Sequence, residues 1–160
     1  MVRVMGRVLG IDFGMKRIGL ALSDPLQMIA FPLKTLQALR SLEDTADLIL
    51  QELSPEVETI VLGLPLLLSG KASTITNTVR RYATFLKTKS NLHLVLWDER
   101  LTTTQVERIL KQSNIKRKKR AQHLDTMSAT LILQTYLDYV NGIINSTEKE
   151  ETKPIGKTSN

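Results

Sequence analysis

Short apolar runs separated by glycine, proline and polar residues dominate the first part of the chain. Such runs are typical of strands, because about four to eight residues suffice for a strand buried on one or both faces. A glycine turn joins the first two runs, so together they predict a hairpin. We expect strands at 4–13, 18–23, 31–37, 59–64 and 92–97, and the last two are apolar enough to be buried on both faces.

Helical periodicity begins after the third predicted strand. Apolar residues recur at steps of three and four from Leu42 to Leu53, and Ser41 can cap this helix with Asp44 three residues on. Helix and strand then alternate, which predicts an α/β fold in which a mixed sheet carries helices on both faces. The predicted helices are 41–53, 74–87, 102–111 and 123–140.

The chain length of 160 residues suits a single domain, which we expect to span 1–142. Polar and charged residues fill 143–160, so we expect a disordered tail there. The chain has no cysteine, which excludes disulfides and thiolate metal sites, and its two histidines argue against a histidine-rich zinc site. No signal segment and no apolar run of about 20 residues is present, so we expect a cytoplasmic protein that does not enter a membrane.

Positive charge is concentrated in one segment, 111–120, which holds six lysines and arginines and no acid. The net charge is +6, so this segment accounts for the whole excess. Such a segment on a neutral body indicates contact with a polyanion, and the alternative is a solvated, flexible loop. Nucleic acid is favoured over a membrane because the segment lacks the apolar partners of an interfacial helix. The candidate contacts are Lys116, Arg117, Lys118, Lys119 and Arg120.

Three acids form the candidate catalytic group: Asp12, Glu99 and Asp125. The first two end apolar strands and the third lies near the start of a predicted helix, so all three can meet in one crevice. Clustered carboxylates repel one another unless a divalent cation neutralises them, and Mg²⁺ and Mn²⁺ prefer oxygen ligands. Paired ions can activate water and stabilise the leaving oxygen in phosphodiester cleavage.

Each acid also has a structural interpretation. Asp12 can be a turn acid, Asp98 and Glu99 can cap the next helix, and Asp125 can be a first-turn acid that interacts with the helix dipole. Lys16 and Arg17, in the turn after Asp12, can contact a substrate phosphate or form solvated ion pairs.

Four blocks of sequence follow one another in a fixed order between about residues 7 and 140. They are 10–21, Gly63-Leu-Pro65 with Gly70, 98–103, and Asp125 with Ala129 and 136–138. In this order they resemble the YqgF/RuvX family, which belongs to the RNase H-like superfamily together with the RuvC Holliday junction resolvase.

The resemblance implies an RNase H-like fold and a bacterial nuclease that matures the 5′ end of 16S ribosomal RNA. It implies Asp12, Glu99 and Asp125 as catalytic acids and metal ligands, with Mg²⁺ or Mn²⁺ as cofactor, and Glu99 rather than Asp98. Arg100, in the third block, is a further candidate substrate contact. The expected partner is a ribosomal RNA precursor, alone or on the ribosomal subunit, and the expected state is a monomer or weak dimer.

One departure bears on the substrate. RuvC-like resolvases carry a glutamate on the strand that corresponds to 60–63, and this chain has no acid there. The alternatives are a DNA junction resolvase, which would need a dimer to cut two strands, and a non-catalytic factor that binds RNA during ribosome assembly.

Overall fold

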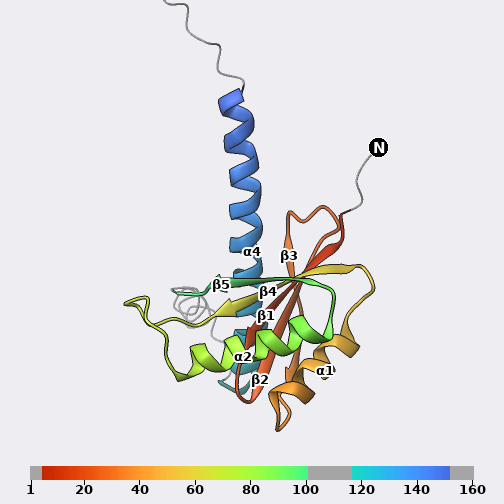
Figure 1. Ribbon diagram of the computed structural model, residues 1–160, viewed down its shortest axis with the longest axis vertical. Coiled ribbons are helices and arrows are strands. Elements are labelled where there is room, and N and C mark those ends of the chain that lie inside the picture. The colour runs from red at the N-terminus through yellow and green to blue at the C-terminus, as the bar shows by residue number, and fades with distance from the viewer. Residues whose placement is uncertain (1–4, 101–116, 152–160) are drawn as a thin grey trace, which may run out of the picture.

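The computed structural model describes residues 5–100 and 117–151, and the side chains of 5–100 and 124–142. Five strands and three helices occur in these residues (Figure 1). In chain order they are β1 (Arg7–Phe13), β2 (Arg17–Ser23), β3 (Ala30–Gln37), α1 (Leu42–Glu52), β4 (Val57–Leu64), α2 (Thr74–Lys89), β5 (His93–Asp98) and α4 (Arg117–Glu151).

The strands form one mixed sheet in the order β3-β2-β1-β4-β5. β1 pairs antiparallel with β2 and parallel with β4, so it lies at the centre of the sheet. β4 and β5 are also parallel, and the carboxyl ends of β1, β4 and β5 therefore lie at one edge of the sheet. This arrangement confirms the predicted mixed sheet and places the end of β1, with Asp12, at the middle of that edge.

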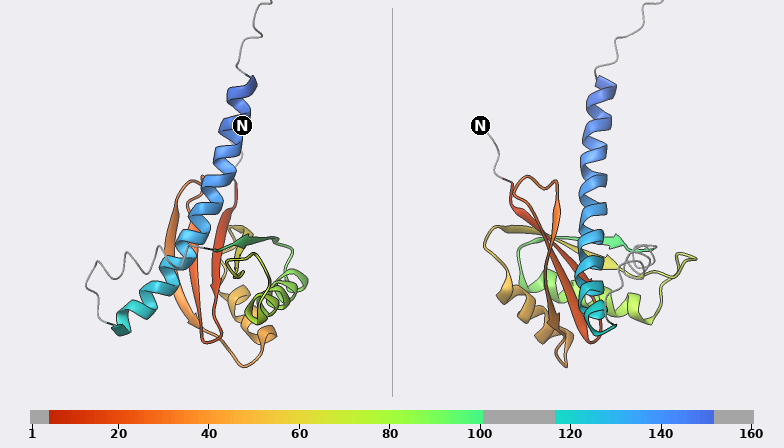
Figure 2. Two further views of the ribbon diagram at one scale, coloured as in Figure 1. Left: turned by 90° about the vertical axis from the view of Figure 1, so that its left-hand side faces the viewer. Right: turned by 180° about the vertical axis from the view of Figure 1, so that it is seen from behind.

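Helices cover both faces of the sheet, as predicted. Figure 2 shows α1 and α2 on one face and α4 running across the other. Successive side chains of a strand point to opposite faces of the sheet, so β1 contributes to a hydrophobic core on each face. Leu9, Ile11 and Phe13 pack with α1 and α2, whereas Val8 packs with α4. Each fully buried aliphatic or aromatic side chain contributes about 1.5–3 kcal/mol, so the two cores hold both helical layers on the sheet.

Both short helices begin at a serine cap. The Ser41 side chain accepts a hydrogen bond of 3.0 Å from the Asp44 backbone N–H, as the sequence predicted. Ser73 and Thr76 form a reciprocal capping box at the start of α2. These caps satisfy backbone donors that the first turn of a helix leaves unpaired, and they fix where each helix begins.

β5 differs from the prediction. We expected 92–97 to be buried on both faces, but β5 is an edge strand, and its Leu96 side chain is 41% exposed. An apolar composition alone does not distinguish a central strand from an edge strand. The predicted helix 102–111 lies outside the described residues.

The last helix is longer than the predicted 123–140, since α4 runs from Arg117 to Glu151. Hydrophobic periodicity marks only the middle of this helix, whereas its two ends contain lysines, arginines and glutamates, which favour helix by intrinsic propensity. α4 therefore crosses the expected boundary between the domain 1–142 and the tail 143–160, and Figure 1 shows it extending beyond the sheet. None of the helices in the described part of the chain is long and apolar enough to cross a membrane.

Candidate active site

Asp12 lies on the central strand, one residue before the end of β1, and pairs in register with Gly19 of β2. Its position in the strand alternation directs it to the face that α4 covers. Within the described residues its carboxylate has no hydrogen bond and no ion pair. Burial raises the pKa of Asp12 to about 8, and the charges of Glu99 and Asp125 add to this rise. The negative charges of Glu99 and Asp125 therefore both make Asp12 harder to ionise.

Glu99 follows directly after β5, and its backbone N–H donates a hydrogen bond of 3.3 Å to the Leu64 carbonyl of β4. Its carboxylate lies over Gly63: a Cβ at position 63 would stand only 2.5 Å from Glu99 Oε2. The glycine on β4 thus leaves the space that the Glu99 side chain occupies. Burial raises the pKa of Glu99 to about 7, with a further contribution from the charge of Asp98.

Asp125 lies on α4 and forms an ion pair with Arg17 of β2, in which Arg17 Nε donates to Asp125 Oδ2 over 2.9 Å. Burial raises the pKa of Asp125, and the guanidinium of Arg17 opposes that rise. α4 begins at Arg117, so Asp125 stands more than two turns inside the helix. The interpretation of Asp125 as a first-turn acid is therefore wrong, because the dipole effect is confined to the terminal turn.

Asp98 and Glu99 are adjacent in sequence but differ in environment. Asp98 is exposed and holds Arg100 through both the backbone N–H, at 3.0 Å, and the guanidinium, at 2.6 Å. The hydrogen bond from Arg100 lowers the pKa of Asp98. Glu99 instead is partly buried beside Asp12. These contacts support Glu99 as the acid of the group, in agreement with the sequence expectation.

Three glycines bring α4 onto the sheet at close range, and they lie on three adjacent strands. A Cβ at Gly19 would overlap the backbone carbonyl of Asp125, and one at Gly10 would lie 2.7 Å from Leu133 Cβ. At Gly63 a Cβ would lie 2.6 Å from Ile132 Cδ1. α4 therefore rests on strand backbone at these points, and this contact holds Asp125 beside the end of β1. We refer to Gly10, Gly19 and Gly63 as the glycine seat.

The candidate substrate contacts are dispersed. Arg17 lies at the acids, Lys16 is exposed in the turn before β2, and Arg100 is held by Asp98. Arg117 to Arg120 form the first turn of α4, whereas Lys116 lies outside the described residues. The structure thus brings together the three acids and Arg17 and leaves Lys16 and Arg100 around them.

The three acids supply only carboxylate oxygens, which is the donor type that Mg²⁺ and Mn²⁺ prefer. The raised pKa values of Asp12 and Glu99 indicate that the negative charge of these two carboxylates lacks compensation. In the part of the chain that the structure describes, no three acids or histidines are close enough to enclose a metal ion. The donor chemistry fits a divalent cation, and closing a ligand set requires the carboxylates to approach one another.

Sequence reasoning found the acids but missed the glycine seat. Gly10, Gly19 and Gly63 fall within the predicted strands 4–13, 18–23 and 59–64, and no packing role was predicted for them. Their signal was available: in each predicted strand, the glycine stands where alternation would direct a side chain toward the helix covering that face.

The chain matches the profile of the RuvX family, described as "Holliday junction resolvase", over residues 6–139. It is 45% identical over 139 residues to a protein of Protochlamydia amoebophila named "Putative pre-16S rRNA nuclease", covering 82% of this chain and 93% of that protein. A protein of Koribacter versatilis with the same name is 43% identical and covers 84% and 88%.

Among solved structures, the fold is similar to that of the fowlpox virus Holliday junction resolvase, with a TM-score of 0.56. The two chains are 12% identical, and the match covers 84% of this chain and 99% of the viral chain. At this identity the likeness concerns the fold alone, and it confirms the RNase H-like mixed sheet of resolvases.

Proposed function

The chain belongs to the RuvX family of Holliday junction resolvase-type nucleases, and from this premise we propose that it cuts a precursor of 16S ribosomal RNA at its 5′ end with the help of a divalent cation. The observation that carries the proposal is Asp12, a carboxylate on the central strand with a pKa of about 8 and two further acids acting on it. The names of the relatives at 45% and 43% identity support RNA as the substrate.

Asp12, Glu99 and Asp125 are the residues that would hold the cation. When bound, the cation supplies an activated water and neutralises charge on the scissile phosphate. The chain's own residues do the positioning: the glycine seat fixes Asp125, and the Leu64 carbonyl anchors the Glu99 backbone. Glu99 lies over Gly63 of β4. RuvC-like resolvases carry a glutamate on the strand that corresponds to β4, and we propose that Glu99 takes its role in this chain.

Arg17 can exchange its ion pair with Asp125 for an ion pair with a substrate phosphate. In this structure it neutralises Asp125, yet its side chain is 47% exposed, against 19% for Asp125. An exposed guanidinium at the edge of an acid group can bind a phosphate with two parallel hydrogen bonds. We propose that Arg17 binds the RNA backbone, which would leave Asp125 available to hold the cation.

A DNA junction is the second candidate substrate, favoured by the description of the family and by the fold shared with the viral resolvase. The two substrates can be compared directly. Wild-type protein, Asp12→Asn and Asp44→Asn are incubated with a 5′-extended 16S precursor and with a four-way DNA junction, each with Mg²⁺, Mn²⁺ or EDTA. Asp44 is an exposed acid on α1, on the face of the sheet away from the acids, so Asp44→Asn is a matched control.

We expect end mapping to show metal-dependent cutting of the RNA by wild type and Asp44→Asn, and none by Asp12→Asn. Cutting of the junction alone would transfer the proposal to DNA. Binding of the precursor without cutting under any metal condition would refute the nuclease and favour a non-catalytic assembly factor.

A further inference from the structure

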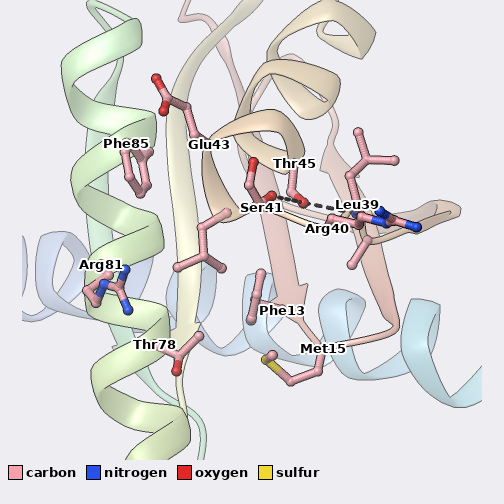
Figure 3. Close-up of a pocket in the computed structure, with 12 residues that line it drawn as sticks. Phe13, Met15, Leu39, Arg40, Ser41, Glu43, Thr45, Thr78, Arg81 and Phe85 are labelled. Carbon is pink, nitrogen blue, oxygen red and sulfur yellow. Dashed lines mark hydrogen bonds between the residues drawn. The ribbon is translucent and has the colours of Figure 1, made fainter.

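A pocket of about 390 Å³ opens on the face of the sheet opposite the three acids. It lies between α1, α2 and the turn that joins β1 to β2 (Figure 3). Backbone hydrogen bonding stabilises its rim, since Ala38 N–H donates to the Lys16 carbonyl over 2.9 Å and Leu39 N–H donates to Thr45 Oγ1 over 3.0 Å. The segment before α1 is thereby tied to the turn on one side and to the helix on the other.

The pocket combines an apolar lining with positive charge. Phe13, Leu42 and Phe85 supply apolar surface, and Met15 stands 65% exposed at the turn. Arg40 and Arg81 lie on opposite sides of the pocket in Figure 3. Two arginines beside an apolar lining make the pocket suited to an anion that also carries an apolar surface.

Neither Arg40 nor Arg81 forms an ion pair within residues 5–100 and 124–142. The acid of the lining, Glu43, is already paired with Lys89, at 3.2 Å between Glu43 Oε1 and Lys89 Nζ. Lys89 also pairs with Asp47, at 3.0 Å, so the lining is best described by its balance of two arginines against one acid, which is net positive. A planar apolar group against phenylalanine and methionine, with a phosphate on one of the guanidinium groups, satisfies both the apolar and the charged part of the pocket. Together these groups constitute a nucleotide.

The position of the pocket connects it to the acids. Asp12 and Phe13 are consecutive residues of β1 and point to opposite faces, Asp12 toward α4 and Phe13 into the pocket. The turn between β1 and β2 lies at this same end, with Met15 lining the pocket and Arg17 paired to Asp125. A single strand that crosses the turn would thus have Arg17 on one side of the sheet and the pocket on the other.

We propose that the pocket binds an unpaired nucleotide of the RNA strand that is cut at the acids, with its base on Phe13, Met15 and Phe85 and its phosphate on Arg81. The inference rests on the proposed function, because it takes the substrate of the acids as its ligand. A free mononucleotide has the same chemistry, and the experiment separates the two sources.

The first measurement is the affinity of the metal-free protein for short single-stranded RNA, by fluorescence anisotropy across a salt series. Arg81→Gln is compared with Arg80→Gln, which removes the same charge one residue away on α2 and outside the pocket. Glutamine and arginine have similar helix propensities, so both variants should fold. We expect Arg81→Gln to weaken binding several-fold and to lower the slope of log K against log salt by about 0.7, as for one lost phosphate contact. Equal losses in the two variants would overturn the pocket in favour of diffuse attraction.

The second measurement tests the base. The methyl resonance of Met15 is followed by NMR as RNA is added, with Met28, which lies two residues before β3 and outside the pocket, as an internal reference. A base stacked in the pocket shifts the Met15 methyl and leaves Met28 unchanged, and an abasic strand of the same charge does not reproduce the shift. A shift with a nucleoside monophosphate but none with RNA would overturn the RNA commitment. The absence of any Met15 shift with either ligand would overturn the pocket itself.

These measurements need no cutting, so they separate the two proposals. Pocket-dependent RNA binding by a protein that never cuts would leave this inference standing while the nuclease proposal fails. Metal-dependent cutting, together with equal RNA affinities of Arg81→Gln and Arg80→Gln, would support the nuclease proposal and overturn the pocket.

Discussion

Replacing Asp12 by asparagine should stabilise the fold while it removes activity. The folded pKa of Asp12 is about 8, against an ordinary value of 3.8, so the folded protein holds this proton more tightly than the unfolded chain does. For such a group, stability falls as pH rises between the two pKa values. Asparagine has nearly the same shape and does not titrate, so the variant escapes this loss.

The magnitude follows from the linkage between protons and folding. One pKa unit corresponds to about 1.4 kcal/mol, so three pH units, from 5 to 8, could change the free energy of unfolding by up to about 4 kcal/mol. Asp12 retains some exposure and its neighbours can relax, so we expect the advantage of Asp12→Asn over wild type to grow by about 2–4 kcal/mol across this range.

The assay is urea unfolding in EDTA at several pH values, followed by circular dichroism. Asp44→Asn is the control, because Asp44 is exposed in the first turn of α1, where loss of its charge should cost about 0.3–1 kcal/mol. An advantage of Asp12→Asn that stays constant from pH 5 to 8, or its absence at pH 8, would refute the account of Asp12 as a repelled, desolvated carboxylate.

Two further predictions concern the same region. Affinity for Mn²⁺, measured by calorimetry, should rise from pH 6 to pH 8 with release of protons. The reason is that Asp12 and Glu99, with pKa values of about 8 and 7, must lose protons to bind a cation. An affinity that does not change with pH would contradict their assignment as ligands. Gly19→Ala should lower the free energy of unfolding by about 1–3 kcal/mol or more, because its methyl group would overlap the Asp125 carbonyl. Gly142→Ala on α4, where a Cβ would meet open space, should be neutral or stabilising by up to about 1 kcal/mol. Chemical denaturation of the two variants checks this, and equal stabilities would argue against the close approach of α4.

The fold was largely predictable because local pattern and global arrangement agree. The apolar runs, the glycine turn and the Ser41 cap all specify the elements that form. The edge position of β5 was not predictable, since it depends on which strand ends the sheet. The length of α4 was also hidden, because the sequence at its two ends carries no periodic apolar signal.

The site was predictable in its residue types and less so in its contacts. A lone charge at the end of an apolar strand identified Asp12, and strand order explains why Glu99 joins it. The pairing of Arg17 with Asp125 spans 108 positions in sequence, so no local pattern could indicate it. The pocket is likewise formed by segments from three separate regions of the chain, and no single one of them contains the pattern of a ligand site.

The glycine seat also constrains how members of such a family can vary in length. An α-helix advances by about 100° per residue, so inserting one residue into α4 between Asp125 and Leu133 would rotate Asp125 away from Asp12 while Leu133 stayed over Gly10. Insertions beyond either end of this nine-residue span would leave the phase of the helix unchanged. We therefore expect related chains to keep the spacing from Asp125 to Leu133 constant and to differ freely in how far the helix extends on each side.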